Sequence, residues 1–361
     1  MDSLNNARKK INEIDEKMAE LFVERMNAVG EIAEYKKSHG LTIFDKAREE
    51  EVIRRNSAIV EDTLLREYYV NFLQNNMAVS RAWQERLISG MKVAYSGTEG
   101  AFAHIASCKL FPTANKISYR SFEEAYHAVE RGECDAAVLP IENSYNGEVG
   151  QVTDLMFSGS LFVNEMLDIA ITQDLLAVEG AEISDIKEVF SHPQALGQCA
   201  EYIKEKKLTT HEFSNTALAA KYVSEKNDKS LAAIASAEAA AIFGLKVLEK
   251  NINASRSNTT KFAVFSRSEN LHRSSEQDVH TIFLFTVRNE AGALAKAIEI
   301  IGKHKFNMRA LRSRPMKELL WQYYFYVEAE GNLNTDEGRQ MLEELKKYCD
   351  KLKSIGTYIK K

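Results

Sequence analysis

The residues best suited to chemistry near the start of the chain are cations on an apolar helix face. A row with 3-4 spacing is apolar at every position except one: Leu4, Ala7, Ile11, Ile14, Met18, Leu21, Arg25, Ala28, Ile32, Tyr35. This spacing predicts one long helix over residues 4–36 that packs on other helices. A guanidinium stays charged and is costly to bury alone, so Arg25 requires an anion from the protein or from a ligand.

Two more cations, Arg8 and Lys36, lie beside this seam. Arg25 and Lys36 are about 16 Å apart along a helix axis, so their long side chains can reach one small anion. Arg8 and Lys36 are about 42 Å apart, which is too far for one helix to bring both to one small acid. A shared site would need Arg8 from a second copy of the chain. Two plainer interpretations stay open: a solvated Arg8, and an Arg25 held in a buried ion pair.

The next two predicted helices add polar groups. Asp45, Arg48 and Glu49 share one face of a helix just past Gly40. A third helix, expected over residues 62–88, has a stripe in which polar groups interrupt an apolar face: Leu73, Met77, Ser80, Gln84, Leu87. If the three helices turn these groups inward, the groups form a cationic pocket that suits a dicarboxylate.

Residues 1–90 resemble the all-helical chorismate mutase of the bifunctional chorismate mutase–prephenate dehydratases, the P-proteins. The residues that carry the resemblance are Arg8, Arg25, Lys36, Asp45, Arg48, Glu49, Ser80 and Gln84. The resemblance implies a homodimer or higher homo-oligomer in which the first helix lends Arg8 to the partner's site. It also implies that Arg8, Arg25 and Arg48 hold two carboxylates, that Lys36 and Gln84 bond the ether oxygen, and that Glu49 takes the hydroxyl. A Claisen rearrangement needs orientation and electrostatic stabilisation but no cofactor.

Composition excludes several classes of protein. A net charge of −5 gives no sign of the basic surface that nucleic-acid-binding proteins use. The sequence has no apolar run long enough to predict a membrane span. The start of the chain is unlike a signal peptide, so we expect a cytoplasmic protein. The scattered cysteines Cys108, Cys134, Cys199 and Cys349 indicate neither disulfides nor a metal site.

From Lys92 onward, short apolar strands alternate with helices, which predicts an α/β domain with polar residues at strand ends. GTEGAFAH (97–104) is a glycine turn before a helix and a weak signal alone. VLPIENSYNGEV (138–149) places Glu142 and Asn143 after a buried strand. SHPQALGQC (191–199) places Ser191 at a helix start, with Gln198 further along, where free N–H groups suit a carboxylate. A plain helix cap at Ser191 is the alternative.

Together with SNTTKF (257–262), these stretches resemble the prephenate dehydratase domain, which implies a two-lobed, periplasmic-binding-protein-like fold. The resemblance places Glu142, Asn143, Ser191 and Gln198 in the cleft between the lobes. It makes Thr260 the hydroxyl that assists loss of the ring hydroxyl while CO2 leaves, by hydrogen-bond donation rather than full proton transfer. Lys261 stands where the family has Arg, so we expect activity with altered prephenate binding.

A charged, serine-rich stretch over 266–278 predicts a linker, and the order β-α-β-β-α-β after it predicts a ferredoxin-like α+β domain. NEAGALAKA (289–297) resembles the turn of ACT domains, which in this family bind L-phenylalanine. The expected allosteric residues are Asn289, Gly292, Ala293, Leu294, Arg312 and Ser313. Arg312 stands where the family has Glu, which favours a second interpretation, an interface domain without a ligand.

The sequence therefore predicts a multidomain, bifunctional enzyme that converts chorismate through prephenate to phenylpyruvate and is inhibited by phenylalanine. The expected domains are 1–90, 91–268 and 279–361. Two alternatives are a small-molecule sensor with a degenerate cleft and a protein in which only the mutase is active.

Overall fold

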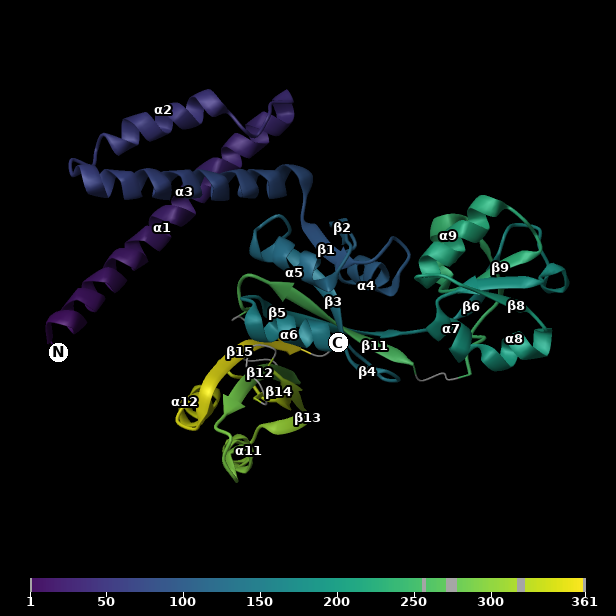
Figure 1. Ribbon diagram of the computed structural model, residues 1–361. Helices are drawn as coiled ribbons and strands as arrows, with labels where there is room; N and C mark the ends of the chain where they lie inside the picture. Colours follow the sequence, from purple (N-terminus) through teal and green to yellow (C-terminus); the bar gives the residue numbers. More distant parts are fainter. Residues whose placement is uncertain (1, 255–257, 271–277, 317–321, 360–361) are drawn as a thin grey trace. The chain divides into compact units, whose positions relative to one another are not determined.

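The computed structural model describes residues 2–254, 258–270, 278–316 and 322–359. The chain forms two compact units, Met1–Met91 and Lys92–Lys361 (Figure 1). Among the described residues, no helix is both long enough and apolar enough to cross a membrane.

The first unit is helical, as predicted, and consists of α1 (Asp2–His39), α2 (Lys46–Ser57) and α3 (Thr63–Ser89). Asp45 and Asp62 cap α2 and α3 by accepting hydrogen bonds from backbone N–H groups of the first turn. The α3 stripe turns inward: Leu73, Met77, Ser80 and Gln84 are buried, and only Leu87 is exposed.

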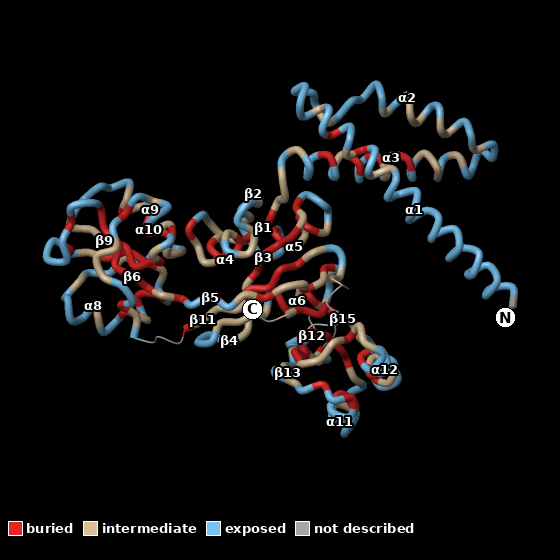
Figure 2. The backbone as a smooth tube through the Cα atoms, turned by 180° about the vertical axis from the view of Figure 1, so that it is seen from behind, coloured by how far each residue is buried: buried red, intermediate tan, exposed pale blue. Residues whose placement is uncertain are grey.

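Only the C-terminal part of α1 is covered within one chain, where Val29 and Ala33 are buried. Neither residue is a position of the predicted seam, which, apart from the half-buried Arg25, is open to solvent, as the pale colour of α1 in Figure 2 shows. Its large apolar side chains are 44–62% exposed: Leu4, Ile11, Ile14, Met18, Leu21. A helix face this apolar is typical of a surface that packs on another protein.

The second unit begins with an α/β lobe. Its elements are β1 (Lys92–Ser96), α4 (Phe102–Leu110), β2 (Asn115–Tyr119), α5 (Phe122–Glu130), β3 (Ala136–Asn143), β4 (Gly147–Glu148), α6 (Gly150–Ser158), β5 (Phe162–Ala170) and β11 (Thr259–Ser266). The strand order is β2-β1-β3-β11-β5, with β4 paired to β3. β11 returns from the far end of the sequence and pairs antiparallel with both β3 and β5.

A second α/β lobe is inserted between β5 and β11. It contains β6 (Asp174–Ala177), η1 (Ile183–Asp185), β7 (Glu188–Ser191), α7 (Pro193–Gln198), α8 (Ala200–Lys206), β8 (Thr209–Glu212), α9 (Thr216–Lys226), β9 (Leu231–Ala235), α10 (Ala237–Phe243) and β10 (Lys246–Glu249). Its strand order is β10-β6-β9-β7-β8. The chain passes from the first lobe to the second at 171–173 and returns between β10 and β11, a stretch of which 250–254 and 258 are described, and this gives the predicted two-lobed arrangement (Figure 1).

A third sheet follows, built from β12 (Val279–Val287), α11 (Ala293–Lys303), β13 (Asn307–Pro315), β14 (Tyr323–Glu330), α12 (Asp336–Leu345) and β15 (Cys349–Ile359). Its strand order is β13-β14-β12-β15, and its elements follow the predicted β-α-β-β-α-β order. Most of the predicted linker, residues 271–277, lies outside the described residues.

The third sheet buries both faces. One face packs with α11 and α12 through residues such as Phe283, Phe285 and Ile300. The other face joins the core of the first lobe, in which Ile282, Leu284, Tyr324 and Tyr326 cluster with Val163, Met166 and Phe265. At Gly356 the approach is so close that an added Cβ would lie 2.3 Å from the Val163 carbonyl oxygen. The third sheet and the first lobe therefore share one hydrophobic core.

Candidate active sites and a C-terminal pocket

The helical unit brings Arg25 of α1 to Ser80 of α3. The Arg25 guanidinium donates to the Ser80 hydroxyl, which in turn donates to the Asn76 carbonyl oxygen at 2.7 Å. Burial lowers the pKa of Arg25, since the fold removes part of its hydration. The partner hydroxyl is neutral, so this contact leaves the positive charge of Arg25 uncompensated and suited to an added anion.

Gln84 lies one turn beyond Ser80 on the same buried stripe. Its side-chain oxygen is buried and accepts no hydrogen bond from any of the described residues. Buried polar atoms are rarely left without a partner in native proteins. An oxygen without a partner in the described part of the chain, on the same helix face as Ser80, which contacts Arg25, is suited to bind a polar ligand.

Lys36 and Glu49 are both held by partners within the unit. The Lys36 ammonium donates to the Ile43 carbonyl oxygen at 2.5 Å. Glu49 forms an ion pair with Arg81, whose guanidinium also lies 5.5 Å from the centre of the Phe44 ring. Sequence reasoning missed Arg81, because its partner is on another helix and no spacing within α3 marks it.

Of the three remaining mutase residues predicted from the sequence, two have partners elsewhere in the helical unit and one is exposed. Asp45 caps α2 by accepting from the Arg48 backbone N–H at 3.0 Å. The Arg48 side chain pairs with Glu51 at 2.7 Å on the exposed surface of its own helix. Arg8 is exposed on α1. The structure thus groups Arg25, Ser80 and Gln84, gives Asp45 and Arg48 partners outside that group, and leaves Arg8 exposed.

In the second unit, Asn143 at the end of β3 lies beside Thr260 at the start of β11. The side-chain oxygen of Asn143, Oδ1, accepts from the backbone N–H groups of Tyr145 and Asn146, each at 3.0 Å. Its amide nitrogen therefore faces the other way and donates to Thr260 Oγ1 at 2.9 Å and to Asn258 Oδ1 at 2.8 Å. Because Thr260 Oγ1 accepts this hydrogen bond, its own hydrogen is available for another acceptor.

More amides gather where the chain crosses between the lobes. Gln173 is 3% exposed on the first crossing, and its side-chain nitrogen lies 3.5 Å from Gln198 Oε1. The Gln173 backbone N–H donates to Asn253 on the second crossing at 3.1 Å. Sequence reasoning missed Gln173 and Asn258, because they are single polar residues within crossings that have no motif of their own.

Ser191 is fully buried, and its hydroxyl donates to the Ile234 carbonyl oxygen at 2.5 Å. A hydroxyl that has used its hydrogen in this way cannot also donate it to a substrate carboxylate. The cap of α7 is His192, whose Nδ1 accepts from the Gln194 N–H at 3.2 Å. Ser191 is therefore neither the helix cap nor a free donor, and it ties β7 to β9.

Glu142 and Lys261 are brought together, but their partners lie on the third sheet. Glu142 forms an ion pair with Arg312 of β13, and Lys261 Nζ lies 3.7 Å from Glu142 and 3.2 Å from Glu328 of β14. Glu142 and Lys261 were expected to lie in the cleft with Asn143 and Thr260. Their contacts instead direct them toward the third sheet. Glu328 was missed by sequence reasoning, because it reads as an ordinary polar residue of a strand.

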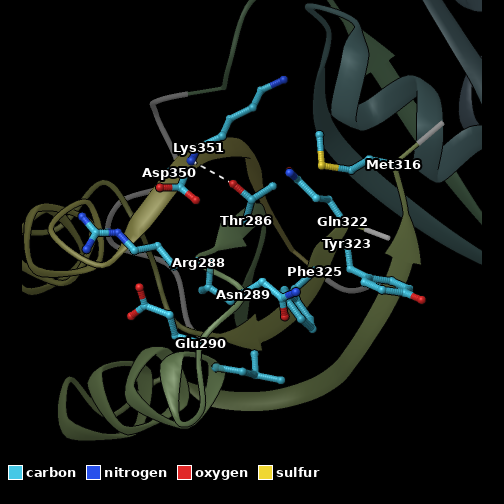
Figure 3. A pocket seen from close by; sticks show the side chains of 12 residues that line it. Thr286, Arg288, Asn289, Glu290, Met316, Gln322, Tyr323, Phe325, Asp350 and Lys351 are labelled. Atoms are coloured by element: carbon cyan, nitrogen blue, oxygen red, sulfur yellow. Dashed lines mark hydrogen bonds between the residues drawn. The ribbon is translucent and has the colours of Figure 1, made fainter. Parts of the chain in front are cut away.

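A pocket of about 410 Å³ lies where β12 ends and α11 begins (Figure 3). The labelled side chains combine the aromatic rings of Tyr323 and Phe325 with the Asn289 amide and both signs of charge, Arg288 and Lys351 against Glu290 and Asp350. Leu294 also lines it, whereas Gly292, with φ +84°, supplies the left-handed turn before α11. Of the other expected allosteric residues, Ala293 begins α11. Arg312 and Ser313 do not line the pocket: Arg312 pairs with Glu142, and Ser313 is exposed on β13.

Comparison with known proteins agrees with this architecture. The family model described as chorismate mutase type II matches residues 7–85, and the one described as prephenate dehydratase matches residues 93–270. A bifunctional chorismate mutase/prephenate dehydratase from Buchnera aphidicola subsp. Acyrthosiphon pisum (strain APS) is 30% identical over 99% of this chain and 96% of its own. One of the same name from Aquifex aeolicus (strain VF5) is 30% identical over 100% of this chain and 99% of its own.

Among solved structures, the prephenate dehydratase from Arthrobacter aurescens in complex with L-Phe has a TM-score of 0.68 and 27% identity. The match covers 74% of this chain and 90% of that one. The two family models match successive parts of this chain, and single bifunctional relatives span nearly all of it. The chain therefore belongs to the bifunctional chorismate mutase/prephenate dehydratases, which rearrange chorismate to prephenate and convert prephenate to phenylpyruvate in phenylalanine biosynthesis.

Proposed function

We propose that chorismate binds in the helical unit between Arg25, Lys36 and the buried Gln84. The support is the uncompensated charge of Arg25 beside the unpartnered oxygen of Gln84. In this assignment Arg25 holds a carboxylate, Lys36 and Gln84 contact the ether oxygen, and Glu49, oriented by Arg81, accepts from the substrate hydroxyl. Such a site works by holding the substrate compact and stabilising charge on the breaking C–O bond.

We also propose that a second copy of the chain completes this site. The exposed apolar residues of α1 supply the reason, because a helix with Leu21 62% and Leu4 58% exposed is costly to leave in water. Arg8 lies on that uncovered length and would reach the partner's pocket, together with rearranged Arg48, Asp45 and Ser80 side chains. The assembly is then at least a homodimer.

For the dehydratase we propose that prephenate lies at the crossing of the two lobes, against Thr260, Asn143 and Gln198. The observation that carries this assignment is the 2.9 Å hydrogen bond from the Asn143 amide to Thr260, which leaves the threonine hydrogen free. Thr260 donates a hydrogen bond to the ring hydroxyl as the C–O bond breaks, and the departing hydroxide takes a proton from solvent and leaves as water. The electrons of the bond to the leaving CO2 enter the ring and make it aromatic. Ser191 supports the site by joining its strands.

Paired substitutions at Thr260 test the dehydratase assignment. Thr260→Val removes the hydroxyl at nearly equal volume and is expected to lower dehydratase kcat by about a hundredfold or more. Thr260→Ser keeps a hydroxyl and should retain most of the rate. Phenylpyruvate absorbance in base follows the product formed from prephenate, and thermal unfolding of the same samples reports on folding. An unimpaired Thr260→Val enzyme would remove Thr260 from the site.

We propose that the third sheet with its two helices is an ACT domain of ferredoxin-like fold over residues 279–361, next to domains over 1–90 and 91–268. Its pocket suits L-phenylalanine, because Tyr323, Phe325 and Leu294 match the ring while carboxylate and cationic groups match the zwitterion. This proposal includes feedback inhibition of the dehydratase. A cytoplasmic location stays a prediction from the sequence.

Calorimetry can test the phenylalanine pocket directly. Wild-type protein should release heat on titration with L-phenylalanine, whereas Asn289→Ala should weaken binding about tenfold, because the amide beside the ligand is lost. Leucine serves as the control ligand, since it lacks the ring. Equal heats for wild type and variant would contradict the assignment of the pocket.

A further inference from the structure

Four charged side chains connect the third sheet to the dehydratase lobe. Arg312 of β13 pairs with Glu142 of β3, and Glu328 of β14 contacts the Lys261 ammonium with both carboxylate oxygens at 3.2 Å. Lys261 also lies 3.7 Å from Glu142, so the four charges alternate in sign along one chain of contacts.

Glu328 is the most buried member of this cluster, with a side chain that is 6% exposed. The Tyr358 hydroxyl donates to its Oε1 at 2.7 Å, and the Tyr326 hydroxyl lies 3.4 Å from Oε2. Burial opposes ionisation of Glu328, but the charge of Lys261 and the Tyr358 hydrogen bond outweigh it and hold the pKa of Glu328 below its usual range. Glu328 is therefore a buried anion whose countercharge comes from the dehydratase lobe.

The cluster lies at the part of the dehydratase that carries its proposed reacting groups. In the β3–β11 ladder, Lys261 is opposite Glu142, and the next pair is Thr260 opposite Asn143. Successive side chains of a strand point to opposite faces of the sheet. The charged pair and the reacting pair are therefore neighbours along β3 and β11, but their side chains lie on opposite faces. The ladder is irregular here, because its register shifts between Lys261 and Phe262, next to Pro140, which has no N–H to donate.

On its other edge β11 pairs with β5 without a register shift from Thr259 to Val264, so the irregularity is confined to the side of β3. On that side, the ion contacts to Arg312 and Glu328 add a connection from the third sheet to Glu142 of β3 and Lys261 of β11. We propose that Glu328 and Arg312 are positioning residues of the dehydratase, which act through Lys261 and Glu142 to hold Thr260 and Asn143 in their reactive geometry. This inference rests on the proposed assignment of Thr260 and Asn143 to the dehydratase site.

The test uses the full chain with Glu328→Gln, Lys261→Met and the double variant. Glu330→Gln is the matched control, since it makes the same substitution two residues further along β14, where Glu330 pairs with Arg309 at the surface. Chorismate mutase activity and thermal unfolding are measured on every sample, so that loss of folding is separated from loss of dehydratase activity.

The expected result for Glu328→Gln is a dehydratase kcat about tenfold lower, with a smaller change in KM, because misplaced reacting groups slow the chemical step more than binding. Glu330→Gln should match wild type. The double variant should be no slower than Lys261→Met alone, because both changes break the same connection. If Glu328→Gln does not fold, the double variant carries the test, since it leaves no buried charge unpaired.

Two results would overturn the proposal. One is a folded Glu328→Gln or double variant with wild-type dehydratase kcat. The other is a double variant whose loss equals the product of the two single losses, because independent effects would indicate a purely structural role for Glu328. The Thr260→Val enzyme distinguishes failure of this inference from failure of the site assignment. If Thr260→Val is fully active, the dehydratase site itself is misassigned, and the inference fails with it.

Discussion

Lys36 and Lys37 are neighbours of equal charge, but only Lys36 is half-buried, with its ammonium directed at the Ile43 carbonyl oxygen. We expect Lys36→Ala to lower mutase kcat by about a hundredfold or more, because the group that stabilises developing charge on the ether oxygen is lost. Lys37→Ala is the matched control and should keep the wild-type rate. Loss of chorismate absorbance measures both, and equal rates for the two variants would exclude the proposed role of Lys36.

Single residues also explain why two departures from the family pattern are compatible with an active enzyme. Lys261 and Arg312 stand where the resemblance leads one to expect Arg and Glu, which favoured the alternative of a sensor with a degenerate cleft. In the structure both have carboxylate partners, Glu328 and Glu142, so neither is an unpaired charge.

At the level of elements, α11 and α12 are joined by His304, the residue that ends α11. Its ring nitrogens lie 2.6 Å from Glu337 and 2.9 Å from Glu344. The hydrogen bond with Glu344 raises the pKa of His304 above its ordinary value of 6.5; burial opposes the shift, and Glu337 adds to it.

The sign of the pH dependence follows from this shift. Because the folded state binds the proton more tightly, the stabilisation is complete below about pH 6.5 and is lost as pH rises through the higher pKa of the folded protein. We expect His304→Gln to abolish this part of the pH dependence. Thermal unfolding of wild type and variant across that range measures it, and parallel curves would show that His304 contributes nothing to it.

At the scale of the whole molecule, the exposed apolar side chains of α1 predict that two chains share each mutase site. Arg8→Ala and Lys36→Ala subunits should each have little mutase activity, because each homodimer lacks one group in both sites. Mixed dimers contain one site with both defects and one site with neither. Mixing after subunit exchange should therefore restore up to about a quarter of the wild-type rate, as a statistical mixture of subunits dictates.

Mixed wild-type and Lys36→Ala subunits are the control, since they should only dilute activity in proportion. If the two inactive variants stay inactive together while subunit exchange is demonstrated by light scattering of differently sized fusions, both groups act within one chain. The proposal that Arg8 crosses to a partner would then be wrong.

Much of this enzyme follows from local patterns. The 3-4 spacing of α1, the Ser80–Gln84 stripe of α3 and the short apolar runs before Asn143 predicted helices and strands, whereas the two-lobed arrangement was implied by the family resemblance. They did so because hydrophobic period and capping act over a few residues, and such signals are written in neighbouring positions.

Other features depend on contacts between residues far apart in the sequence. The partners of Glu49, Glu142 and Lys261 are Arg81, Arg312 and Glu328, and no local spacing connects the members of these pairs. The sequence by itself determined the elements, the family and the order of the domains. Only the tertiary structure decided that Glu142 and Lys261 face the third sheet rather than the Asn143–Thr260 group, because the β3–β11 pairing and the shared core set which side of each strand meets which neighbour.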